Sequence, residues 1–120
     1  MTDFAQGVAA FHTDLFAANR NDYTLVALSE FGRTARENES QGTDHGTATS
    51  IFVMGGAVIG NRVMRQWPGL APEQLYDGVD LAPTTDFRDV LGEMLAKRAG
   101  NTNLGAIFPN YTPTFRGVFA

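Results

Sequence analysis

Apolar residues recur at helical spacing near both ends of the chain. Four of them, at intervals of three or four, predict an amphipathic helix over residues 3–18, capped by Thr2 or Asp3: Phe4, Val8, Phe11 and Leu15. A second helix is predicted from a cap at Thr84 or Thr85 through Arg98, with Gly100 as its stop. Its predicted core-facing stripe consists of Phe87, Val90, Leu91, Met94 and Leu95.

Short apolar runs between these helices predict strands. Tyr23–Leu28 is too short and too rich in β-forming residues for a helix, and we expect a buried strand of the parallel kind. Ala48–Met54 predicts a second strand, ended by a turn at Gly55-Gly56, and Val63–Trp67 is compatible with a short third one. After the last helix, Pro109 and Pro113 indicate an extended tail.

The connection between the first two strands carries the candidate chemistry. Residues 32–46 are polar and aperiodic, which is long for a connection in a compact domain and typical of functional loops. Ligands of open α/β sheets bind beyond the carboxyl ends of the strands. The first strand is followed there by two carboxylates, a guanidinium and an imidazole, which are Glu30, Arg33, Asp44 and His45.

Composition narrows the possible partners. The chain has 120 residues, of which 43% are hydrophobic, enough for one modest core. A net charge of -4 and a pI near 4.9 argue against binding to nucleic acid or to an anionic membrane. The absence of cysteine excludes thiolate chemistry, and no apolar run is long enough for a membrane span. Residues 1–11 show no secretory signal.

Four segments resemble the C-terminal part of the domain-of-unknown-function 1501 family, which is placed in the alkaline phosphatase and sulfatase superfamily. The resemblance extends from Phe4 to Tyr111, and its segments are residues 26–34 (VALSEFGRT), 42–46 (GTDHG), 52–56 (FVMGG) and 81–91 (LAPTTDFRDVL). It implies an α/β fold, the C-terminal portion of an alkaline phosphatase-like three-layer α/β/α sandwich with few strands and flanking helices. Residues 1–120 are then a single domain or the C-terminal fragment of a larger domain.

The resemblance also implies roles for the candidate residues. Glu30 matches the aspartate of the superfamily's Asp-His-Gly metal motif, Phe31 its histidine, and His45 a later metal-binding histidine. Glu30 and His45 would hold a divalent metal such as zinc or calcium, and Asp44 would ligate it or orient His45. Phe31 cannot be a ligand. Arg33 is the candidate catalytic residue, because its planar guanidinium can pair with two oxygens of a tetrahedral anion. Ser29 or Thr34 could add a hydroxyl donor.

Two hypotheses of function follow. In the first, the chain is the C-terminal segment of a metal-dependent phosphate- or sulfate-ester hydrolase that acts on a small anionic ester. We expect no turnover by the chain alone, because the superfamily's nucleophile lies on an N-terminal half that is missing. In the second, the chain is a non-catalytic α/β scaffold for binding or cell-surface assembly.

Plainer explanations stay open for the same residues. Glu30 and Arg33 could form an ordinary surface ion pair, and Asp44-His45 could belong to a solvated turn. His12 has no partner at metal-binding spacing, so we expect it to be structural. We expect self-association through an exposed sheet edge. The resemblance implies a periplasmic or exported parent protein, although this chain carries no export signal.

Overall fold

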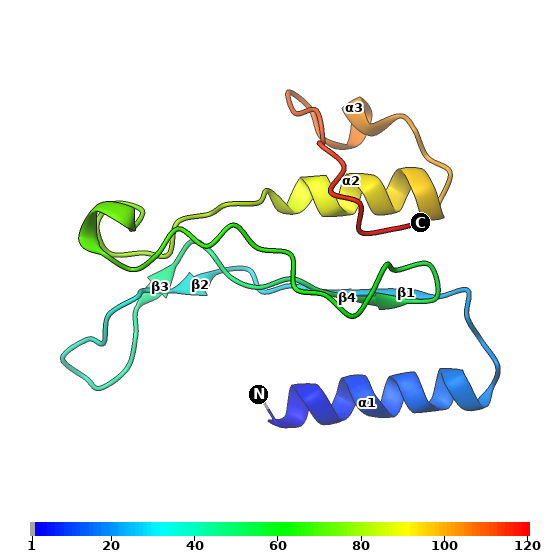
Figure 1. Ribbon diagram of the computed structural model, residues 1–120, viewed down its shortest axis with the longest axis horizontal. Coiled ribbons are helices and arrows are strands. Elements are labelled where there is room, and N and C mark those ends of the chain that lie inside the picture. Colours follow the sequence, from blue (N-terminus) through cyan, green and yellow to red (C-terminus); the bar gives the residue numbers. More distant parts are fainter. Residues whose placement is uncertain (1) are drawn as a thin grey trace.

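A computed structural model describes residues 2–120. The helices in this part of the chain are α1 (Thr2–Ala17), the 3-10 helix η1 (Pro72–Gln74), α2 (Phe87–Arg98) and α3 (Leu104–Ile107). The strands are β1 (Thr24–Ala27), β2 (Gly32–Arg33), β3 (His45–Gly46) and β4 (Phe52–Gly55). They form two small antiparallel sheets, so the chain is a mixed α/β protein. α1 and α2 lie on opposite faces of the β1–β4 sheet, and the β2–β3 hairpin extends beyond it (Figure 1).

The prediction of a buried parallel strand at Tyr23–Leu28 is wrong in direction and in burial. β1 is antiparallel to β4, with Thr24 opposite Gly55 and Ala27 opposite Phe52, and all its residues are half-buried. A parallel neighbour needs a long crossover, usually through a helix. Here the chain between β1 and β4 folds into the β2–β3 hairpin and returns, so β4 runs back along β1. No strand forms at Val63–Trp67 within the described residues.

The first predicted helix is confirmed as α1, and its apolar side faces the sheet as expected. Phe4 packs on Phe52 with ring centroids 5.5 Å apart, and Phe11 meets the edge of Tyr23 at 5.6 Å. Nevertheless α1 has no buried residue, and Phe4 and Phe11 are each 41% exposed. Two short strands offer too little surface to cover the whole apolar side of a 16-residue helix.

The second predicted helix is confirmed as α2, but its cap and its buried side differ. Asp86, rather than Thr84 or Thr85, caps the helix, since its Oδ1 accepts from the main-chain N–H of Arg88 at 2.9 Å. Gly100, with φ of 64°, follows the helix as predicted. Phe87 of the expected stripe is 48% exposed, and the buried positions are Asp89, Val90, Gly92 and Glu93.

The C-terminal segment, residues 111–120, explains this buried side of α2. Val118 and Phe119 complete the hydrophobic core with Val90, and the segment pairs with the turn after β4, where Ile59 N–H donates to the Val118 carbonyl at 2.9 Å. Gly92 lets the segment pass closely, because a Cβ there would lie 2.7 Å from Pro113. The core of the molecule therefore lies between α2, β4 and the last residues of the chain.

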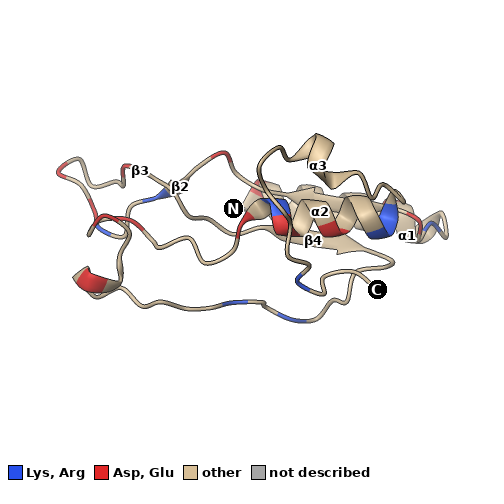
Figure 2. Ribbon diagram, turned by 90° about the horizontal axis from the view of Figure 1, so that it is seen from above, with Lys and Arg blue, Asp and Glu red and all other residues tan. Residues whose placement is uncertain are grey.

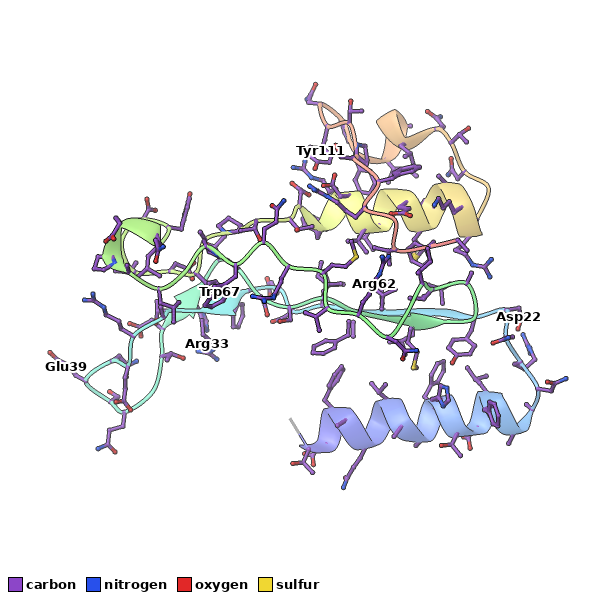
Figure 3. All side chains as sticks on the ribbon, viewed as in Figure 1. Asp22, Arg33, Glu39, Arg62, Trp67 and Tyr111 are labelled. Atoms are coloured by element: carbon purple, nitrogen blue, oxygen red, sulfur yellow. The ribbon has the colours of Figure 1, made fainter. Side chains whose placement is uncertain are left out.

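Asp89 anchors the start of this segment although it is only 1% exposed. Its carboxylate accepts from the hydroxyl of Tyr111 and the N–H of Thr114, both at 2.7 Å, and from Nε of Arg116 at 2.8 Å. Tyr111 lies above α2 in Figure 3. Asp89 and Arg116 thus form a largely buried ion pair, which stabilises a fold when every lone pair finds a donor.

Glu93, one helical turn further on, anchors the end of the segment and is fully buried. It accepts from the main-chain N–H groups of Arg116 at 2.8 Å and of Val118 and Phe119 at 3.2 Å. Nζ of Lys97 lies 3.1 Å from Oε1 of Glu93 and also donates to the Phe119 carbonyl. Two carboxylates of α2 therefore accept the hydrogen bonds that a neighbouring strand would otherwise accept.

Acid should weaken this attachment. Burial alone would raise the pKa of both carboxyls, but the hydrogen bonds that they accept outweigh it and hold the pKa of Asp89 and of Glu93 below the ordinary range. A lowered pKa contributes stability above the unfolded value of about 4, and this contribution is lost as pH falls through the folded value. We therefore expect the free energy of unfolding, measured in urea, to decline below about pH 4. A decline equally steep in Asp89→Asn would contradict this assignment.

Candidate functional site

The polar stretch that was predicted to be an aperiodic loop contains a β-hairpin. Gly32 pairs with Gly46 and Arg33 with His45. One step further, the N–H of Thr34 donates to the Asp44 carbonyl at 3.0 Å. Asn38 organises the tip, as its Oδ1 accepts from the N–H groups of Ser40 and Gly42, each at 3.0 Å. The structure thus holds this stretch in place through both main-chain pairing and side-chain hydrogen bonds.

Arg33 and His45 share one face of this hairpin. Phe31 lies on the same face, stacked on the His45 imidazole with ring centroids 3.9 Å apart. The Arg33 guanidinium carbon is 5.4 Å from the Phe31 centroid, and Nη1 donates to the Thr43 carbonyl at 3.0 Å. Both Arg33 and His45 are exposed, and Figure 3 shows Arg33 beside β2, away from the core around α2. The hairpin therefore presents a guanidinium and an imidazole together to solvent.

Asp44 points to the opposite face. Neighbouring residues of a strand alternate between its faces, and the Asp44 carboxylate accepts from Asn38 Nδ2 at 2.9 Å. With Thr34, Asn38 and Val79 it lines a shallow, open hollow. Glu30 is exposed in the bend before β2, and no ion pair joins it to Arg33 among the described residues. Of the four candidates, the structure brings together Arg33 and His45.

Sequence reasoning missed Asp80, which lies behind this hairpin. It is 5% exposed, and its Oδ2 accepts from the main-chain N–H of Thr47. Residues 76–80 form a tight turn with positive φ at Asp77 and Gly78, and Asp80 bridges to Thr34. The Asp-Gly pair at 77–78 is a strong hairpin signal that could have indicated this turn. Nothing in the sequence indicated that its last residue would reach the β2–β3 hairpin.

The described residues do not assemble a complete metal site. Within residues 2–120, no three His, Asp or Glu side chains lie close enough together to hold an ion. His45 offers one exposed imidazole, while Asp44 is engaged with Asn38 on the other face. The chemistry that Arg33 and His45 support directly is the binding of an oxyanion, through N–H donors and a permanent positive charge.

Basic and acidic residues are interspersed along the described residues, 2–120. Figure 2 shows Lys and Arg distributed among Asp and Glu along the chain rather than gathered on one element. Among residues 2–120, none of the helices combines the length and the apolar character needed to cross a bilayer.

Comparison with known proteins gives one family. Residues 1–106 match the family described as "Protein of unknown function (DUF1501)", which is most of the chain. No curated protein and no solved structure matches. The segments that carry Glu30, Arg33, Asp44 and His45 lie within the matched residues. The chain belongs to the DUF1501 family.

Proposed function

We propose that this chain forms one wall of the substrate site in a metal-dependent phosphate- or sulfate-ester hydrolase of alkaline phosphatase-like fold. The observation that carries the proposal is the pairing of Arg33 with His45 across β2 and β3, with both side chains exposed. The resemblance of residues 26–34 and 42–46 to that superfamily supports the class of reaction. The ligand would be a small anionic ester.

The geometry suits a tetrahedral anion. Thr34 and Asp44 are joined by a main-chain hydrogen bond across the hairpin, and Arg33 and His45 form the next pair along the strands. This neighbouring pair is of the non-hydrogen-bonded kind, in which the two Cα atoms lie about 4.5 Å apart. Arginine has five N–H donors, and one of them is engaged with the Thr43 carbonyl. The remaining donors can bind two anion oxygens, and in the metal-free chain the His45 ring can donate to a third. In this role Arg33 would bind and orient the ester.

A divalent metal such as zinc or calcium would, when bound, polarise a phosphoryl or sulfuryl oxygen. We propose His45 as the principal ligand that this chain contributes, with Glu30 as a second. Asp44 could join them only by leaving Asn38 and crossing to the other face of β3. Because the described residues bring no three such side chains together, further ligands would have to come from other groups.

A non-catalytic binding or assembly scaffold is the second candidate. Phe31 favours it, since this residue stacks on His45 and cannot bind a metal. Export of the protein and self-association through the open edge of the β1–β4 sheet also remain proposals; the sheet consists of these two strands alone within the described residues.

Metal analysis discriminates between the two candidates. The protein is purified in its natural form without chelator, beside His45→Ala and a control, His12→Ala, on α1. We expect about one metal ion per chain in the wild type and in the control, and a large loss in His45→Ala. Equal metal content in all three would remove His45 from the metal site. A metal-free wild type would favour the scaffold.

A further inference from the structure

Asp80 stands out among the buried acidic side chains. Asp89 and Glu93 direct both carboxylate oxygens at donors, whereas Asp80 Oδ1 has no hydrogen-bond partner within the described residues. A buried oxygen without a donor is unfavourable for folding, and an uncharged side chain of the same size would at least avoid burial of the charge. The position of this side chain suggests what it does.

Asp80 contacts both strands that carry the proposed site. Its main chain forms an isolated antiparallel β-bridge with Thr34, the neighbour of Arg33. The carbonyl of the adjacent Val79 accepts from the N–H of Ala35 at 3.0 Å. Its side chain reaches across to Thr47 N–H, two positions after His45. One residue therefore ties the end of β2 to the end of β3.

Asp80 also lies directly behind the exposed pair. Gly46 and Gly32 alternate with His45 and Arg33, so they face the rear of the hairpin. A Cβ at Gly46 would overlap Asp80 Oδ1 and would lie 2.8 Å from the Arg33 carbonyl oxygen. The carboxylate thus fills the space that a side chain at position 46 would take, and it supports the strand opposite the imidazole.

We infer that Asp80 is a positioning residue that fixes the spacing of Arg33 and His45 for anion binding, acting through Thr34, Gly46 and Thr47. This inference rests on the proposed function. Asp80 contributes a hydrogen bond to Thr47 and fills a volume behind the hairpin, so asparagine should replace it, because its amide oxygen can accept from Thr47 N–H and its side chain has the same size. Alanine supplies neither.

The test is binding of inorganic phosphate, followed by NMR, to the wild type, Asp80→Ala and Asp80→Asn, with Glu73→Ala as an exposed charge control. A second readout is the NOE between the Hα atoms of Arg33 and His45, which the close pairing makes strong. We expect Asp80→Ala to bind phosphate about tenfold more weakly and to lose this NOE. Asp80→Asn and Glu73→Ala should stay within about threefold of the wild type and keep it.

The two readouts separate the inference from the proposed function. If Asp80→Ala keeps both the NOE and the affinity, the positioning role is overturned. If the wild type binds no phosphate, the proposed function fails, and the NOE alone decides whether Asp80 sets the spacing. The methyl signals of Val118, which lies in the core near α2, report whether each variant is folded. Should Asp80→Ala unfold, Asp80→Ser is used, because its shorter side chain cannot reach Thr47.

Discussion

Replacing Glu93 by alanine should produce the largest loss of stability of any single substitution considered for this chain. The side chain is fully buried and accepts from the N–H groups of Arg116, Val118 and Phe119 and from Lys97. Removing it leaves buried donors without an acceptor and an ammonium group without its partner. Breaking such a buried network costs about 3–5 kcal/mol, which we expect as the loss in the free energy of unfolding measured in urea.

Amide hydrogen exchange locates the cause of this loss. In Glu93→Ala, protection should fall at Arg116, Val118 and Phe119 before it falls in β1 and β4, because the segment is released first. The control is Glu39→Ala, an exposed residue of the β2–β3 hairpin, which should change stability by less than about 0.5 kcal/mol. A similar small change in Glu93→Ala would show that the segment does not depend on this carboxylate.

Gly32→Ala should disrupt the hairpin that carries the candidate site. Gly32 is buried, and a Cβ there would overlap the main-chain oxygen of Ala48 and lie 2.6 Å from its carbonyl carbon. Main chain cannot move aside as the end of a flexible side chain can. We expect a loss of about 3 kcal/mol in the free energy of unfolding and disappearance of the Arg33 to His45 cross-strand NOE.

The same hairpin supplies a matched control. Gly42→Ala adds the same methyl group near the tip, where the nearest atom is Asn38 Oδ1 at 3.7 Å, an ordinary contact. This variant should keep the NOE and stay within about 0.5 kcal/mol of the wild type. If Gly32→Ala behaved like Gly42→Ala, the close approach of Ala48 to β2 would be wrong.

The two long helices were predictable because their signals are local, whereas the short helices η1 and α3 were not predicted. Apolar spacing and capping residues located α1 and α2, and the spacing gave the side of α1 that contacts Phe52 and Tyr23. The direction of β1 was not predictable in this way, since it depends on where the chain returns after 24 further residues, between Ala27 and Phe52. The buried side of α2 was predicted in part, since Val90 is buried and Met94 packs against the core. Asp89 and Glu93 were missed because they carry charges, which usually indicate exposure, and their donors lie on a distant segment.

The candidate site could be predicted only in part. Arg33 and His45, two of the four predicted residues, lie opposite each other on β2 and β3. The hairpin was missed because its paired arms are two residues long and therefore show no alternation of polar and apolar positions. Once the position of β3 is known, the alternation of side chains along a strand places Asp44 and His45 on opposite faces of the hairpin. Asp80 could not have been found, because its contact with Thr47 joins positions 33 residues apart.

The most direct test of the central claim, that Arg33 and His45 form one anion-binding face, is an NMR titration of the histidine rings with inorganic phosphate at constant ionic strength. His12 on α1, stacked on Phe16, serves as the internal reference. We predict that the His45 ring signals shift and saturate while those of His12 do not, and that Arg33→Ala abolishes the saturation. Small, linear and equal shifts of both rings would contradict the claim.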